Sequence, residues 1–108
     1  MKFSEFFSKF KEEFSNQDLS QLPPFLAIQI NIKGDEEEGG TFYIEIKDQQ
    51  LHIEPYAYEH RDVAITISQK YFDQLVHGKL DPIWAFTSGK LKAEGDLGKA
   101  LELKKLMK

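Results

Sequence analysis

Hydrophobic residues recur every three or four positions at the start of the chain. The repeat consists of five phenylalanines: Phe3, Phe6, Phe7, Phe10 and Phe14. In an α-helix these positions fall within an arc about 100° wide, so the spacing predicts an amphipathic helix over residues 3–14. Three interpretations of this stripe remain open: packing against the core, a movable lid, or a face that docks on a membrane or a protein partner.

The helical spacing gives way to strict alternation after Pro23 and Pro24, which cannot continue a helix. Apolar and polar residues then alternate over five segments: residues 26–32, 42–46, 51–53, 63–67 and 91–93. Such alternation predicts β-strands, and the short polar connections after the first and second segments are typical of hairpins. Because each predicted strand is apolar on one side only, we expect one solvated sheet face and one face covered by helices.

Three further helices are indicated by residues that favour helix ends. Ser68, Asp81 and Asp96 are suitable N-caps, and the helix after Asp81 begins with a proline, as first helical positions often do. Gly78 and Gly89 suit the left-handed conformation that commonly ends a helix. The helix predicted after Asp96 continues through the leucine-rich C-terminus.

The composition suits a small globular protein. With 108 residues, 41% of them hydrophobic, we expect a single domain over residues 1–108. The absence of cysteine excludes disulfides, thiolate metal sites and cysteine nucleophiles. Neither a secretion signal nor an apolar run of membrane-spanning length is recognisable, so we expect a cytoplasmic protein.

The charge is negative overall but unevenly distributed. The net charge of −4 disfavours nucleic acid as a partner, because a phosphate backbone would be repelled. Acidic residues concentrate at 34–40, whereas six lysines accompany three carboxylates from Ser88 to the C-terminus, a local excess of +3. Solvated surfaces account for most such asymmetries. The alternative is weak, salt-sensitive contact with an anionic membrane through these lysines and the N-terminal phenylalanines.

Motifs for catalysis or metal binding are missing from the sequence. The stretch GDLGKA at residues 95–100 has two residues between its glycines, where a phosphate loop needs four, and an alanine follows its lysine. His52, His60 and His77 lack the spacing of metal ligands on a common helix. Since a Gly-x-Ser-x-Gly nucleophile motif is also missing, we expect a protein that is not an enzyme.

Four short motifs in the C-terminal half carry a family resemblance. They are GKLDP at residues 78–82, AF at 85–86, SGKL at 88–91 and GD at 95–96. With this spacing, residues 62–108 resemble the lipid-binding domain of the sterol carrier protein type 2 family. The resemblance implies an α+β fold with a five-stranded, mostly antiparallel sheet, helices covering one face, and an apolar cavity between the layers. It also implies that no metal or organic cofactor is needed.

The resemblance makes eight apolar residues candidates for the lipid-binding wall. They are Phe72, Leu75, Val76, Ile83, Trp84, Phe86, Leu101 and Met107. Periodicity alone cannot distinguish a filled core from a hollow one, so ordinary core packing remains the alternative for these positions. Trp84 and Thr87 depart from the residues common in the family, and both change the volume and polarity near the expected cavity.

The function expected from the resemblance is non-catalytic intracellular lipid binding and transfer. A fatty acyl, sterol-like or isoprenoid chain would be shielded in an apolar tunnel. One alternative is an accessory subunit that presents a hydrophobic intermediate to a partner enzyme, with the phenylalanine stripe as its docking face. Another is a small hydrolase that uses the cavity as its substrate pocket.

Overall fold

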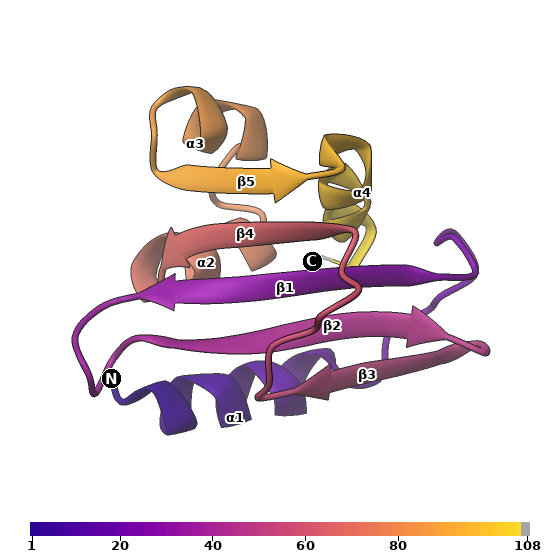
Figure 1. Cartoon of the computed structure of the whole chain (residues 1–108), viewed down its shortest axis with the longest axis horizontal. Coiled ribbons are helices and arrows are strands. Elements are labelled where there is room, and N and C mark those ends of the chain that lie inside the picture. The colour runs from indigo at the N-terminus through magenta and orange to yellow at the C-terminus, as the bar shows by residue number, and fades with distance from the viewer. Residues whose placement is uncertain (107–108) are drawn as a thin grey trace.

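A computed structural model describes residues 1–106 of the chain as a sheet of five strands with helices packed against it (Figure 1). The elements in chain order are α1 (Phe3–Phe14), β1 (Leu26–Lys33), β2 (Gly40–Lys47), β3 (Gln50–Glu54), β4 (Val63–Ser68), α2 (Gln69–Val76), α3 (Pro82–Thr87), β5 (Leu91–Gly95), α4 (Leu97–Leu101) and the 3₁₀ helix η1 (Glu102–Leu106). Within residues 1–106, none of these helices is long and apolar enough to cross a bilayer.

The strands are ordered β3-β2-β1-β4-β5, and every neighbouring pair is antiparallel except β1 and β4, which are parallel. Ile30 at the centre of β1 pairs with Phe42 on one side and with Ile65 on the other. The alternating apolar residues of all strands therefore share one face. The predicted α+β class and mostly antiparallel sheet are confirmed.

The phenylalanine stripe of α1 packs against the core. Phe7, Phe10 and Phe14 are buried, and their partners Phe42 of β2 and Phe72 of α2 are fully buried. The ring centroid of Phe10 lies 5.3 Å from that of Phe42 and 5.1 Å from that of Phe72. Aromatic pairs at such distances contribute about 0.5–1.5 kcal/mol each beyond the burial of their area. Of the three interpretations of the stripe, core packing is the one that this geometry shows.

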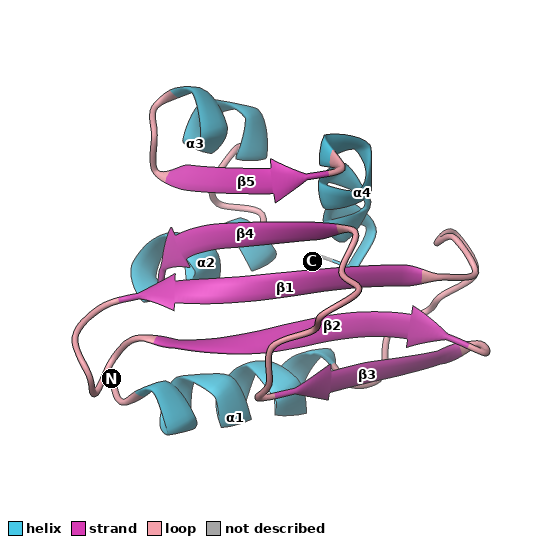
Figure 2. Ribbon diagram, in the orientation of Figure 1, coloured by secondary structure: helices cyan, strands magenta, loops and turns pink. Residues whose placement is uncertain are grey.

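The opposite sheet face differs from the fully solvated face that the alternation predicts. The connection between β3 and β4, residues 55–62, crosses β2 and β1 on the side away from the helices (Figures 1 and 2). We call this segment the strap. The backbone N–H of Tyr58 donates a 3.0 Å hydrogen bond to the side-chain oxygen of Gln29, which is only 8% exposed. The Tyr58 hydroxyl donates a hydrogen bond to the Glu45 carboxylate. This bond, and to a smaller extent the burial of the hydroxyl, raises the pKa of Tyr58 to about 12.

The predicted helix caps are present. The Ser68 hydroxyl accepts a hydrogen bond from Tyr71 N–H at 3.3 Å, and the Asp81 carboxylate accepts one from Ile83 N–H at 2.9 Å. Asp96 likewise caps α4. These bonds satisfy backbone donors that a helix leaves unpaired in its first turn.

The C-terminal helix is shorter than the leucine pattern predicts. After the single turn of α4 the backbone tightens into η1, in which residues three apart lie on the same side. Leu103 and Leu106 are therefore buried together, whereas Leu97 and Leu101 of α4 are exposed. The switch from α to 3₁₀ spacing separates a buried pair of leucines from an exposed pair.

Asp62 joins the end of the strap to both β1 and α4. Its carboxylate accepts a 2.9 Å hydrogen bond from Ala27 N–H, and its own N–H donates to the Ala27 carbonyl at 2.8 Å. Its carbonyl accepts from Asp96 N–H at 2.8 Å. Gly95, with φ of 119°, lies against this carbonyl, and an added Cβ would come within 2.5 Å of the oxygen. Only glycine fits here, and the start of α4 depends on it.

We therefore expect Gly95→Ala to lower the free energy of unfolding by about 1–3 kcal/mol, from backbone strain and the clash with the Asp62 carbonyl. Urea denaturation measures the change. The matched control is Gly98→Ala inside α4. There the nearest atom to a new Cβ is a side-chain oxygen of Asp96 at 3.2 Å, so the loss of stability should be much smaller. Equal effects of the two substitutions would contradict this account of Gly95.

Candidate functional site

An apolar groove of about 200 Å³ opens between α3, α4 and the end of the sheet formed by β4 and β5. Twelve residues line it: Ile65, Leu75, Pro82, Ile83, Phe86, Leu91, Ala93, Leu97, Ala100, Leu101, Leu103 and Lys104. Lys104 is the one charged residue among them. Within residues 1–106 this groove is therefore the concavity best suited to an apolar ligand.

Three parts of the chain build the groove, each for a local reason. The floor is the inward face of the paired strands, where Ile65 of β4 lies opposite Ala93 of β5. One wall is α3, which Asp81 and Pro82 start and which presents Ile83 and Phe86, three residues apart, to the groove. The other wall is α4 and the beginning of η1. The small side chains of Ala93 on the floor and Ala100 on the wall leave an open space, which the larger apolar side chains surround.

The structure brings together half of the residues expected to form the lipid-binding wall. Leu75, Ile83, Phe86 and Leu101 line the groove, Leu75 from the buried side and the other three from exposed positions. Met107 lies outside the described residues.

The remaining expected residues lie elsewhere. Phe72 and Val76 are on the side of α2 that faces α1, in the buried core. Trp84 is on α3 but not among the residues that line the groove, and its side chain is exposed. The space between α1 and the sheet is filled by aromatic rings, and a void of only about 10 Å³ remains there. Phe72 and Val76 lie at the edge of that filled region, where they also line a larger cleft between α1 and α2.

Sequence reasoning missed several groove residues. Ala93 and Ala100 are small, so they attract no attention as apolar anchors, yet their size is what creates the space. Leu97 and Lys104 could have been found from the spacing in the predicted last helix. Positions 97, 100, 101 and 104 share one face of an α-helix. That spacing was the signal that could have identified this wall.

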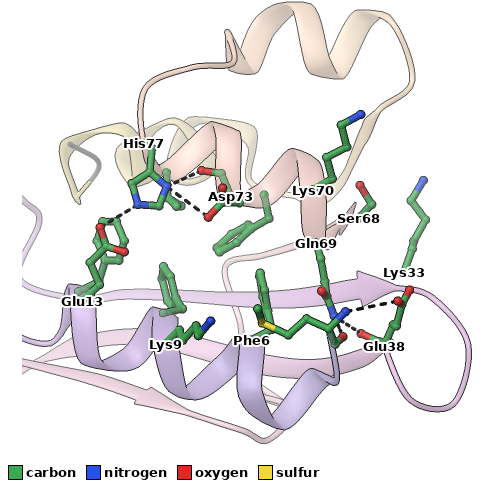
Figure 3. A pocket seen from close by; sticks show the side chains of 15 residues that line it. Phe6, Lys9, Glu13, Lys33, Glu38, Ser68, Gln69, Lys70, Asp73 and His77 are labelled. Atoms are coloured by element: carbon green, nitrogen blue, oxygen red, sulfur yellow. Dashed lines mark hydrogen bonds and ion pairs between the residues drawn. The ribbon is translucent and has the colours of Figure 1, made fainter.

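A second, larger cleft of about 560 Å³ lies between α1 and α2 (Figure 3). Its floor is apolar, with Phe6, Phe10 and Phe72, but charged side chains surround its mouth. These are Lys9, Glu13, Lys33, Glu38, Lys70, Asp73 and His77. Although the cleft is larger than the groove, an apolar chain placed in it would lie beside solvated charges, so volume alone does not make it the better lipid site.

Polar bridges connect the two sides of this cleft at both ends (Figure 3). At one end the Gln69 side-chain amide donates to the Met1 carbonyl at 2.7 Å and to the Glu38 carbonyl at 2.9 Å. At the other end His77 Nδ1 lies 2.7 Å from the Asp73 carbonyl, and Nε2 lies 2.8 Å from the Glu13 carboxylate. Both ring nitrogens face acceptors, which favours the doubly protonated imidazolium. The Asp73 carbonyl, and after it the Glu13 carboxylate, raises the pKa of His77 above its usual 6.5.

This arrangement predicts a pH-dependent contribution to stability. A raised folded-state pKa means that the stabilisation is complete below the unfolded-state pKa and is lost as pH rises through the folded-state value. We expect His77→Gln to lower the free energy of unfolding by less than about 1 kcal/mol near pH 6, and by less still near pH 9. Urea denaturation at the two pH values checks this, with His60→Gln on the exposed strap as control. A His77→Gln effect that grows with pH would contradict the assignment.

The described residues hold no cluster of three or more histidine and acidic side chains that could bind a metal ion. The lining of the groove itself contains no histidine, carboxylate or hydroxyl group. What the groove offers chemically is apolar surface with one cation at its rim.

Comparison with known proteins gives one family match and several relatives. A model of the SCP-2 sterol transfer family matches residues 7–108. Hydroxysteroid dehydrogenase-like protein 2 from Bos taurus is 39% identical over 74 residues, which make up 66% of this chain and 17% of that protein. The chain therefore spans about a sixth of the length of this curated relative.

Two solved structures show the same fold. The sterol carrier protein domain 2 of Helicoverpa armigera superposes with a TM-score of 0.72 at 26% identity, covering 96% of this chain and 84% of that one. Apo sterol carrier protein 2 of Yarrowia lipolytica superposes with a TM-score of 0.64 at 26% identity, covering 74% of this chain and 64% of that one.

Proposed function

This chain belongs to the SCP-2 sterol transfer family, and we propose on that premise that it is a non-catalytic lipid carrier whose ligand lies in the groove between α3 and α4. The observation that carries the proposal is the lining of the groove, which is apolar except for Lys104. An apolar chain that moves from water into the groove would not bury any polar group of the protein without a hydrogen-bond partner.

The position of Lys104 favours a ligand with an anionic head. Its side chain is exposed at the rim, where an ammonium group can meet a carboxylate that remains in contact with water. The acyl chain of the ligand would then run inward over Ala100 and Ala93 toward Leu75. A fatty acid fits this description, with its head at the surface and its methyl end at the floor.

The size of the groove indicates that it must widen to hold a long chain. Its volume of about 200 Å³ is below the roughly 300–1,000 Å³ of most small-molecule sites. Burying about 14 methylenes contributes roughly 11 kcal/mol, and association costs at least about 4 kcal/mol, which leaves micromolar affinity. A chain that enters only partly would bind far more weakly. We infer that α3 and α4, which are short helices held by side-chain caps, move apart around the ligand.

A second candidate function is suggested by the relatives. Because the matching region makes up only 17% of a hydroxysteroid dehydrogenase-like protein, such a domain can accompany an enzyme. The chain would then present its lipid to a catalytic partner. The hydrolase alternative has no support in the groove, whose lining carries no nucleophile and no acid or base other than Lys104.

We expect Ala100→Phe to weaken fatty acid binding at least tenfold. The ring would occupy the space of two or three methylenes, each of which contributes about 0.8 kcal/mol. Displacement of a fluorescent fatty acid measures the affinity, and circular dichroism confirms the fold. If this variant does not fold, Leu101→Gln at the exposed rim tests the same wall.

Two control variants locate the site. Ala57→Phe makes the same substitution on the exposed strap and should bind as the wild type does. Lys9→Glu reverses a charge at the cleft between α1 and α2 and should also leave the affinity unchanged. A loss of binding in Lys9→Glu with full binding in Ala100→Phe would move the site to that cleft.

A further inference from the structure

We propose that the outer surface of α3 and α4 docks the protein on an anionic lipid bilayer. Large apolar side chains that remain about half exposed are concentrated on these two helices. They are Ile83, Trp84, Phe86, Leu97 and Leu101, each between 46% and 61% exposed. Exposed apolar residues gathered in one place mark an interaction surface far more often than isolated ones do. We call these five residues the apolar patch.

The patch is not explained by the groove alone. Ile83 and Phe86 contribute to one wall of the groove, and Leu97 and Leu101 to the other. Trp84, which lies between Ile83 and Phe86 on α3, does not line the groove and is 51% exposed. Both helices lie at the β5 end of the sheet, remote from α1 (Figure 1). The phenylalanines of α1, which the sequence offered as a membrane face, are largely buried in the core. The structure therefore places the exposed apolar surface at the opposite end of the molecule.

Charge complementarity favours an anionic surface as the occupant. Residues 79–108 carry seven lysines and four carboxylates, a net +3, whereas residues 1–78 carry seven basic and fourteen acidic residues, a net −7. Asp81 and Asp96 cap the two helices, and Glu102 pairs with Lys105 at 2.8 Å. Lys79 and Lys90, on either side of α3, are exposed and form no ion pair within the described residues.

These features match the physical demands of a bilayer surface. Each lysine close to an anionic membrane contributes about 1 kcal/mol, and tryptophan is enriched at the boundary between head groups and acyl chains. The acidic remainder of the molecule is repelled by the same surface, so the protein orients with α3 and α4 toward the lipid. The mouth of the groove then faces the bilayer. Its use for lipid entry rests on the proposed function, but the docking itself does not.

Trp84 is the only tryptophan in the chain, so its fluorescence reports on this surface directly. We expect vesicles of phosphatidylcholine with phosphatidylglycerol to shift its emission to shorter wavelength, and brominated acyl chains to quench it. Vesicles of phosphatidylcholine alone should have little effect, and high salt should reverse the shift because it screens the lysines. Emission that anionic vesicles leave unchanged would overturn the proposal. The proposal would also be overturned if this surface bound a protein partner while the Trp84 emission showed no contact with vesicles.

A matched pair of variants tests the role of the charges. The double substitution Lys79→Glu and Lys90→Glu should weaken partitioning to anionic vesicles more than tenfold. Lys2→Glu with Lys47→Glu changes the net charge equally but at exposed positions outside α3 and α4, and should have a much smaller effect. Equal losses in the two variants would show that net charge alone governs binding and would contradict a specific docking surface.

Docking and lipid binding can fail separately. Ala100→Phe fills the groove and leaves the outer surface intact, so it should dock as the wild type does while losing fatty acid affinity. A wild-type protein that docks but binds no fatty acid would overturn the proposed function alone. One that binds fatty acid with no change of Trp84 emission on anionic vesicles would overturn the docking surface alone.

Discussion

Packing of the α1 phenylalanines against Phe42 and Phe72 determines where this fold can hold a ligand. Phe10 contacts both of these fully buried rings, and Phe7 contacts Phe42 at a centroid distance of 5.4 Å. Together the rings fill the space between α1 and the β1–β2 part of the sheet. An apolar chain would have to displace several of them to enter there. The groove at the other end, where α3 and α4 cover the sheet incompletely, is lined by apolar residues except for Lys104.

The two ends of the molecule differ in how firmly their elements are held. The α1 end is closed by buried rings and by polar bridges from Gln69 and His77. The α3 and α4 end consists of two short helices, fixed by single cap residues and by backbone bonds through Asp62. Elements with few buried contacts open at lower free-energy cost than a packed core does. In the proposed function the groove therefore lies where widening costs the least free energy, and the same helices carry the apolar patch.

Much of the fold could be predicted because its signals are local. The alternation in each strand, the caps at Ser68 and Asp81 and the phenylalanine spacing each depend on neighbours within a few residues. The candidate site was harder to predict, because it depends on which apolar residues other elements leave uncovered. Phe72 and Ile83 look alike in the sequence, yet α1 buries the first and nothing covers the second. The burial of Gln29 was unpredictable for the same reason, since it depends on the path of the strap.

In the proposed function, the ligand occupies the groove between α3 and α4 while the aromatic core stays closed. Isotope-filtered NOE spectroscopy of the methyl-labelled protein with a long-chain fatty acid tests it most directly. We expect contacts from the acyl chain to the methyl groups of Leu75, Ala93 and Ala100. Contacts confined to the methyl groups of Met1 and Val76, which line the cleft between α1 and α2, would instead place the ligand in that cleft.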